Sequence, residues 1–354
     1  YGALLHLRAE LYRRHGLASY RAPCPVISVG NLSAGGTGKT PMVLWLAQRL
    51  RGWPQRLAIV SRGYGAAARP VADGPRGVTV VADPDGIRLA SPQAGDEPLL
   101  LARNLPGVTV LTGANRARLI EYAVTRYGAG IILMDDGFQH LRVQRDLDLL
   151  LMDARHPLGN GHVLPGGILR EWPRAVQRAD AILLTRCPTE ALFEQAREIL
   201  APWVCDKPLL RADHQGVACL RLGDEQPLPL ATLAQQPVLA FCGIARPDSF
   251  ARSLAAISVS SRAFLAFPDH FAFTRASITR LIQQARACQA EALLCTEKDA
   301  VKVQPEWLEE GTSAFPLYYL RMRMHFATEP LWLNQRLRLL LGPAGPDAGP
   351  HPPA

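Results

Sequence analysis

At residues 26–40 the chain reads VISVGNLSAGGTGKT, and a helical pattern follows from Pro41 to Leu50. A strand-like run ends at Val29, and the turn after it has glycines at positions 35, 36 and 38. Without β-carbons, these glycines let backbone N–H groups surround a phosphate, and the N-terminus of the next helix adds its dipole. In such a loop Lys39 would reach the β- and γ-phosphates and the Thr40 hydroxyl would bind Mg²⁺. The segment therefore predicts a phosphate-binding loop (P-loop).

One position departs from the usual pattern G-x-x-x-x-G-K-S/T, because Ser33 stands where its first glycine is expected. A glycine-rich turn with a structural lysine is the alternative interpretation. The flanking strand and helix favour a nucleotide site. The residues expected to bind ATP are Ser33, Ala34, Gly35, Gly36, Thr37, Gly38, Lys39 and Thr40.

A second acidic element follows the apolar run Ile131 to Met134, where Asp135 and Asp136 come directly after a predicted strand. Carboxylates suit Mg²⁺, which keeps several waters while one or two protein carboxylates bind it. Two aspartates that end a strand can also belong to an ordinary turn. Together with the P-loop, however, they indicate a metal site in which Asp135 or Asp136 contacts the ion.

Short apolar runs alternate with helical patterns between Pro25 and Arg186, which is typical of a mainly parallel sheet covered by helices. Strand-like runs recur at residues 238–242, 292–295 and 317–320, whereas residues 187–237 have weak periodicity and several prolines. We therefore expect an α/β protein with a P-loop domain and a second, smaller α/β domain. The expected divisions are an amphipathic helix at 1–20, the P-loop domain at 21–205, the second domain at 206–341 and a disordered Gly, Pro and Ala-rich tail at 342–354.

Composition narrows the class of protein. Of the 354 residues, 48% are hydrophobic and 20% charged, which excludes a disordered chain, and no run of 18 apolar residues predicts a membrane-spanning helix. Lys and Arg number 39 against 31 Asp and Glu, and this net charge of +8 favours an anionic partner. The seven cysteines include no C-x-x-C pair, so we expect reduced thiols in the cytoplasm.

Residues 1–20 have a basic amphipathic pattern, with leucines on one side and Arg8, Arg13, Arg14 and His15 supplying positive charge. This pattern fits an ordinary helix packed on the core as well as a helix that lies on an anionic membrane surface. Residues 1–20 alone leave both interpretations open.

Two further groups could act on an acceptor hydroxyl. Asp96 stands at the start of a predicted helix, where a carboxylate more often serves as an N-cap. His270 follows Asp269 among aromatic residues, and a carboxylate beside an imidazole can take part in proton transfer. A hydrogen-bonded core histidine is an equally good interpretation of His270.

The motifs become recognisable as an ordered set. They are GN at 30–31 with GGTGKTP at 35–41, SRGYG at 61–65, GDEP at 95–98, DDGFQH at 135–140, LPGGILRE at 164–171, FPDH at 267–270 and TEKDAVK at 296–302. In this order they resemble the tetraacyldisaccharide 4'-kinase family of lipid A biosynthesis, over the chain from its N-terminal helix to about residue 330. The resemblance implies ATP- and Mg²⁺-dependent phosphorylation of the 4'-hydroxyl of an acylated glucosamine disaccharide 1-phosphate. It also implies two α/β/α lobes with the active site between them.

The resemblance also implies residue roles and a location. Asp96 would be the catalytic carboxylate and His270 its partner, with Lys39 and Asp136 in the catalytic shell and Thr40 and Asp135 on the metal. Arg170 and Glu171 are weaker candidates for the cleft, and Asp269 would hold the ring of His270. The protein would act peripherally at the cytoplasmic face of the bacterial inner membrane, where residues 1–20 would meet anionic lipid. We expect no nucleic-acid partner and no obligate protein partner.

Two other classes compete with this interpretation. A nucleotide-driven switch or metallochaperone can also carry GGTGKT, but its ATPase branch has a signature lysine where this chain has Ala34. Guanine-specific GTPases carry N/T-K-x-D, whereas the lysine of TEKD at 296–299 is displaced by one position. A basic binding module without chemistry would leave the P-loop and the Asp135-Asp136 pair unexplained.

Overall fold

The computed structural model describes residues 10–12, 16–63, 75–91, 93–310 and 313–343. Most of the expected helix at 1–20, Tyr64 and Gly65 of the SRGYG motif, and nearly all of the expected tail lie outside the described residues. Within the described part of the chain, no helix is both long and apolar enough to cross a membrane. All seven cysteines are free thiols.

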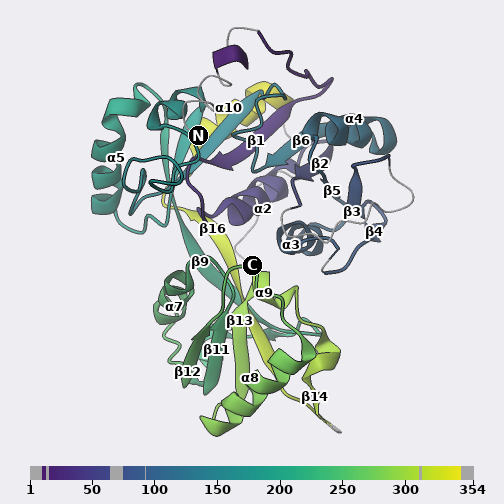
Figure 1. Cartoon of the computed structure of the whole chain (residues 1–354), viewed down its shortest axis with the longest axis vertical. Coiled ribbons are helices and arrows are strands. Elements are labelled where there is room, and N and C mark those ends of the chain that lie inside the picture. Colours follow the sequence, from purple (N-terminus) through teal and green to yellow (C-terminus); the bar gives the residue numbers. More distant parts are fainter. Residues whose placement is uncertain (1–9, 13–15, 64–74, 92, 311–312, 344–354) are drawn as a thin grey trace.

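The first lobe is built on parallel strands in the order β8-β7-β1-β6-β2-β5, which continues through antiparallel β3 to β4 (Figure 1). Every residue of β1 and β7 is buried, as the continuous apolar runs predict for a sheet covered on both faces. The elements are β1 (Val26–Asn31), α2 (Lys39–Leu50), β2 (Arg56–Ser61), β3 (Thr79–Asp83), β4 (Gly86–Ile87), α3 (Asp96–Asn104), β5 (Thr109–Thr112), α4 (Arg116–Tyr127), β6 (Ala129–Asp135), β7 (Leu147–Asp153), η1 (Pro173–Arg178), β8 (Ala181–Thr185) and α5 (Glu190–Val204).

The second lobe has its own parallel strands in the order β12-β11-β13-β16, and its core contains an aromatic cluster. In that cluster Phe241, Phe267, Phe271 and Phe273 pack with ring centroids 4.7–6.4 Å apart. The elements are β9 (Leu209–Arg221), β10 (Pro227–Leu228), α6 (Leu230–Gln235), β11 (Val238–Cys242), α7 (Pro247–Ala256), β12 (Ala263–Ala266), α8 (Arg275–Ala287), β13 (Ala292–Thr296), α9 (Glu297–Ala300), η2 (Pro305–Leu308), β14 (Glu309–Glu310), β15 (Ser313–Ala314), β16 (Leu317–Phe326) and α10 (Leu331–Leu341). The α/β class and the parallel sheet are confirmed.

Two long strands join the lobes (Figure 1). β9 pairs with β8 of the first lobe at its start, where Leu209 lies opposite Ile182, and then runs antiparallel to β16 from Ala212 to Arg221. β16 in turn pairs with β13 of the second lobe. The lobes therefore share one continuous 14-stranded sheet. Neither β9 nor β12 was predicted from the sequence.

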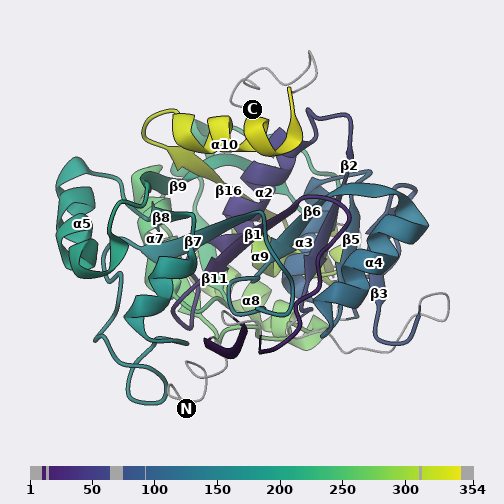
Figure 2. The same cartoon turned by 90° about the horizontal axis from the view of Figure 1, so that it is seen from above.

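The last helix returns to the first lobe. Leu333, Leu337 and Leu341 of α10 belong to the same buried cluster as α2 and β1, and α10 lies near α2 when the molecule is viewed from above (Figure 2). Trp53 Nε1 donates a hydrogen bond of 3.0 Å to the carbonyl of Gly342 at the end of the helix. The boundaries proposed at 205 and 341 stay a prediction, but residues 331–341 pack with the P-loop lobe.

This packing is tested by replacing Leu337, which is fully buried, with alanine. We expect Leu337→Ala to lower the free energy of unfolding by about 2–5 kcal/mol, because it leaves a cavity between α10 and α2. Leu339, on the same helix, is 80% exposed, and Leu339→Ala should change the value by less than about 0.5 kcal/mol. Urea unfolding followed by tryptophan fluorescence measures both, and equal effects of the two variants would contradict the assigned packing.

Candidate active site

The P-loop is held in shape by contacts from three sides. The Asn31 side chain donates hydrogen bonds to the carbonyls of Ser33 (2.7 Å) and Gly35 (3.2 Å). The Ala34 N–H donates to the carbonyl of Ile168 (2.6 Å), and Thr185 Oγ1 donates to the carbonyl of Thr37 (2.8 Å). The GN, LPGGILRE and GGTGKT motifs therefore form one structural unit.

Gly38 precedes α2 with φ 85°, a conformation that favours glycine, and Lys39 and Thr40 begin the helix. Gly35 also has a positive φ, of 110°, and both Gly35 and Gly36 are exposed. The first turn of α2 contains no acidic side chain. The free N–H groups and the positive end of the helix dipole are therefore available to a phosphate.

Asp136 is the anionic partner of Lys39. Lys39 Nζ lies 3.4 Å from Asp136 Oδ1, and Arg170 donates to both carboxylate oxygens at 2.9 Å. Although burial opposes ionisation, Lys39 and Arg170 hold the pKa of Asp136 below its ordinary value. Arg170 thus belongs to the site, whereas Glu171 pairs with Arg178 through two hydrogen bonds of 2.8 Å.

Asp135 has a different environment, although it is the next residue. It ends β6, its side chain is buried, and Ser61 Oγ donates to its Oδ2 at 3.0 Å. Its Oδ1 is buried without a hydrogen-bond partner among the described residues. Burial, with the negative charges of Glu97 and Asp136, raises the pKa of Asp135 to about 7. A buried carboxylate oxygen without a proton donor fits a divalent cation, so Asp135 suits the predicted Mg²⁺ site.

A buried arginine stands beside this aspartate pair, and sequence analysis missed it. Arg116 begins α4, is 3% exposed, and donates through one guanidinium nitrogen to the carbonyl of Gly113 at 2.5 Å. Burial lowers the pKa of Arg116 to about 10, against the nearby charges of Asp135 and Asp136. The guanidinium remains charged at neutral pH and places a third cation, after Lys39 and Arg170, near these carboxylates.

Asp96 and His270 meet across the junction between the lobes. His270 Nδ1 lies 3.1 Å from Asp96 Oδ2, with Asp96 on α3 of the first lobe and His270 on the loop after β12 of the second. The N-cap of α3 is Gly95, and Asp96 is the first residue inside the helix. Asp96 therefore does not serve as the N-cap. Asp269 Oδ1 accepts a hydrogen bond from the backbone N–H of His270 at 3.0 Å, while its other oxygen is 3.9 Å from His270 Nε2.

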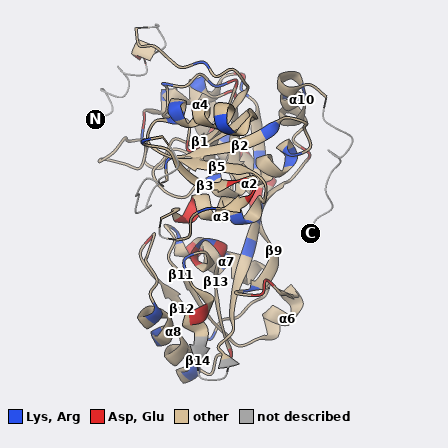
Figure 3. Cartoon of the chain, turned by 90° about the vertical axis from the view of Figure 1, so that its right-hand side faces the viewer, with Lys and Arg blue, Asp and Glu red and all other residues tan. Residues whose placement is uncertain are grey.

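Further ion pairs hold α3 against the second lobe, and Figure 3 shows acidic and basic positions on both sides of this junction. Lys298 Nζ lies 3.2 Å from Glu97 Oε1. Glu297, which is buried, accepts hydrogen bonds from Asn104 (3.1 Å), Arg321 (2.9 Å) and Arg323 (3.2 Å). These contacts fix the distance between Asp96 and His270.

A histidine of β9, one of the two strands that join the lobes, lies against the P-loop. The imidazole of His214, on β9, lies so close to Gly38 that a β-carbon there would come within 2.3 Å of Nε2. His214 Nε2 is buried without a hydrogen-bond partner among the described residues. Burial, reinforced by the positive charge of Arg186, lowers the pKa of His214 to about 3. No local pattern indicates this contact, because it joins segments 176 residues apart.

The two lobes also share a buried carboxylate at the end of β7. Asp153 Oδ2 accepts hydrogen bonds from Arg186 of the first lobe (2.7 Å) and Arg246 of the second (2.6 Å). A β-carbon on Gly36 would lie 3.8 Å from the Arg186 guanidinium, so this arginine lies beside the P-loop. Positive charge therefore flanks the P-loop on this side too.

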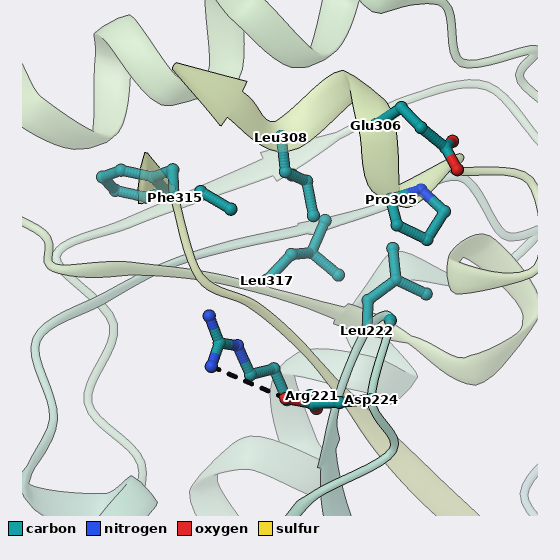
Figure 4. Close-up of a pocket in the computed structure, with 10 residues that line it drawn as sticks. Arg221, Leu222, Asp224, Pro305, Glu306, Leu308, Phe315 and Leu317 are labelled. Carbon is teal, nitrogen blue, oxygen red and sulfur yellow. Dashed lines mark ion pairs between the residues drawn. The ribbon is translucent and has the colours of Figure 1, made fainter. Parts of the chain in front are cut away.

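A separate hollow of about 250 Å³ lies far along the second lobe, near η2 and β15 (Figure 4). Arg221 and Asp224 form an ion pair of 3.7 Å in its lining, and Glu306 is the third charged residue there, among mostly apolar neighbours. It contains none of the candidate catalytic residues. Nor does the described part of the chain hold any group of three or more His, Cys, Asp or Glu that could bind a metal.

Comparison with known proteins supports one family. The family model described as tetraacyldisaccharide-1-P 4'-kinase matches residues 1–340. The tetraacyldisaccharide 4'-kinase of Syntrophotalea carbinolica is 40% identical over 341 residues, covering 95% of this chain and 88% of that protein. The enzyme of the same name from Syntrophus aciditrophicus is 39% identical over 307 residues, covering 84% of this chain and 80% of that protein.

A solved structure agrees with this result. The crystal structure of an apo form of LpxK from Aquifex aeolicus in complex with ATP superposes with a TM-score of 0.74 at 28% sequence identity. The match covers 96% of each chain. The likeness therefore extends over both lobes, including the strands that join them.

The buried imidazole predicts a specific pH dependence of stability. His214 has a pKa of about 3 in the folded protein and an ordinary value near 6.5 when unfolded, so below pH 6.5 the unfolded chain binds the extra proton. Stability should therefore fall as the pH drops from 7 to 5, by about 1–2 kcal/mol from this residue alone. The variant His214→Gln, which cannot titrate, should lose less stability over this range. Urea unfolding at pH 7, 6 and 5 measures the difference, and parallel curves for the two proteins would show that His214 takes up a proton as readily in the folded protein as in the unfolded chain.

Proposed function

Because the chain belongs to the tetraacyldisaccharide-1-phosphate 4'-kinase family, it transfers phosphate from ATP to the 4'-hydroxyl of the lipid A disaccharide precursor, and we propose that it does so where the P-loop, α3 and the loop 267–270 meet. The observation that supports this location is the 3.1 Å contact between Asp96 and His270, formed by both lobes together. Family membership also separates this chain from the nucleotide-driven switch and from the binding module without chemistry.

The P-loop supplies the nucleotide site. ATP and Mg²⁺ are the cofactors, and the backbone of residues 33–38 with Lys39 would bind the phosphates. The hydroxyl of Thr40 and Asp135 Oδ1, which has no partner among the described residues, would hold Mg²⁺, which when bound neutralises phosphate charge. Asp136 keeps the ammonium of Lys39 in place through their 3.4 Å ion pair. Much of the expected rate enhancement comes from this arrangement of charge.

Asp96 has the geometry of a general base. In the proposed step the 4'-oxygen attacks the γ-phosphorus, the bond from that phosphorus to the β,γ-bridging oxygen breaks, and ADP leaves with the electron pair. The carboxylate of Asp96 accepts the proton of the hydroxyl. His270, whose Nδ1 faces Asp96, orients the carboxylate, and Asp269 positions His270 through its backbone N–H.

An anionic membrane surface is the proposed meeting place with the substrate. The substrate carries four acyl chains, so an enzyme that leaves it in the lipid avoids exposing them to water. The net charge of +8 and the basic residues Arg8, Arg13 and Arg14 favour an anionic surface. Leu11 and Leu17, which the structure describes, are about 40% exposed. We therefore assign the enzyme to the cytoplasmic face of the inner membrane as a peripheral protein, without an obligate protein partner.

The base assignment predicts the effect of Asp96→Asn. We expect kcat to fall about 10²- to 10⁴-fold, because the amide cannot accept the proton, while the affinity for ATP stays within about twofold. The assay is transfer of ³²P from γ-labelled ATP to tetraacyldisaccharide 1-phosphate in mixed micelles with Mg²⁺. Asp85→Asn is the matched control, since that carboxylate is 83% exposed and pairs with Arg88 at the far edge of the sheet.

Two outcomes would be informative in opposite ways. Retention of wild-type turnover by Asp96→Asn would remove Asp96 from the role of base. Lys39→Ala should lose phosphate transfer and also bind ATP more weakly, because Lys39 lies in the P-loop. Weakened ATP binding thus distinguishes a defect of the nucleotide site from a defect of the base.

Binding to an anionic membrane can be tested by removing positive charges from the N-terminal segment. Replacement of Arg8, Arg13 and Arg14 by glutamine should weaken binding to vesicles containing phosphatidylglycerol by roughly 1 kcal/mol per arginine. The control replaces Arg118, Arg197 and Arg252, all exposed on α4, α5 and α7, and removes the same number of charges. Co-sedimentation at fixed salt measures both variants, and equal binding by the two would contradict a specific role for the N-terminal segment. Such replacement is preferable to deletion of residues 1–20, because the Tyr20 N–H donates to the carbonyl of Arg142.

A further inference from the structure

A buried lysine stands behind the proposed base. Lys302, two residues after α9, has a side chain that is 4% exposed, and its Nζ lies 3.9 Å from Asp96 Oδ2. The Asp96 side chain is 14% exposed. An ammonium at this distance and depth interacts with a carboxylate far more strongly than a surface pair does, because little water screens it.

The ammonium of Lys302 cannot move away freely. Asp299 Oδ1 lies 2.6 Å from Nζ, and Asp299 is itself fully buried. The other oxygen of Asp299 accepts hydrogen bonds from Thr296 Oγ1 (2.7 Å) and from the Gly243 N–H (3.0 Å). The ring centroid of Phe273 lies 5.1 Å from Nζ, within the range of a cation–π contact. The lysine is therefore held in one position by groups of the second lobe only.

The charged groups that face Asp96 come from three elements. His270 Nδ1 is 3.1 Å away on the loop after β12, and Lys302 is 3.9 Å away after α9. Lys298, on α9, is directed to Glu97 at 3.2 Å and Asp269 at 3.6 Å, and Glu97 is the neighbour of Asp96 on α3. Among the described groups, Lys302 is thus the lysine that lies against Asp96 itself.

We propose that Lys302 is a positioning residue for the phosphate transfer: its ammonium, held 3.9 Å from Asp96 Oδ2, keeps this carboxylate directed toward the acceptor hydroxyl. The inference rests on the proposed role of Asp96 as the base. Lys302 itself touches neither ATP nor the sugar, and acts through Asp96. Because Lys302 and His270 both belong to the second lobe, the base is complete only while this lobe lies against α3.

The alternative is a purely structural lysine that neutralises the buried Asp299. A double-mutant cycle separates the two roles, because a residue that acts through Asp96 has no effect on turnover once Asp96 is gone. We expect Lys302→Met to lower kcat about 10- to 100-fold with an unchanged KM for ATP. In the Asp96→Asn background, the same substitution should change kcat less than about threefold.

The double-mutant cycle is the readout that a purely structural role would not move. Losses of kcat that multiply in the double variant Asp96→Asn with Lys302→Met, or a KM for ATP that changes together with kcat in Lys302→Met, would overturn the proposal.

Lys302→Met alone leaves Asp299 as a buried unpaired carboxylate and could prevent folding. The variant Lys302→Met with Asp299→Asn removes both charges together, while the amide oxygen can still accept from Gly243. This variant should fold, as measured by thermal unfolding, and still lose turnover as Lys302→Met does. If it regains wild-type turnover, Lys302 serves only Asp299. If Asp96→Asn retains turnover, the base assignment itself fails, which is a distinct result.

Discussion

The pairing of β9 with both β8 and β16 is the constraint on which the rest of this structure depends. Backbone hydrogen bonds between strands fix register as well as direction, and a shift of one residue would reverse every side chain. Here one antiparallel ladder sets the second lobe relative to the P-loop sheet. The position of His270 opposite Asp96, and that of His214 on Gly38, both follow from this register.

The same arrangement gives two adjacent carboxylates different chemistry. Asp136 has two cations against it and remains ionised, whereas Asp135 is buried, has one oxygen without a partner among the described residues, and has a pKa of about 7. The difference arises because Asp135 is the last residue of a buried strand, while Asp136, with φ 52°, turns its side chain toward Lys39 and Arg170. One group thus suits a metal ion and the other suits an ammonium, although they are neighbours in the chain.

The sequence allowed the local parts of this protein to be predicted and left the distant contacts open. The P-loop and the strand that ends at Asp135 were predicted because glycine spacing and continuous apolar runs are local signals. β9 was missed because its charged and polar residues, among them Asp213, His214 and Gln215, hide any alternation in a strand that serves two lobes. The return of α10 to the first lobe could not be predicted, since an amphipathic pattern shows that a face is buried but not against what. The contact between Lys302 and Asp96 could not be predicted either, because no local pattern shows which distant residue a buried side chain meets.

Division of the site between two lobes has a functional consequence. The P-loop, Lys39 and Asp136 are held by contacts within the first lobe, so they can bind a nucleotide whatever the second lobe does. The proposed base, Asp96, in contrast depends on contacts that cross the junction, from His270 to Asp96, from Lys298 to Glu97 and from Glu297 to Asn104. Loss of these contacts would leave ATP bound beside a carboxylate without its partners. If Asp96 is the base, as proposed, this division makes proton removal depend on the relative position of the lobes, and transfer to water in the absence of the acceptor would then be limited.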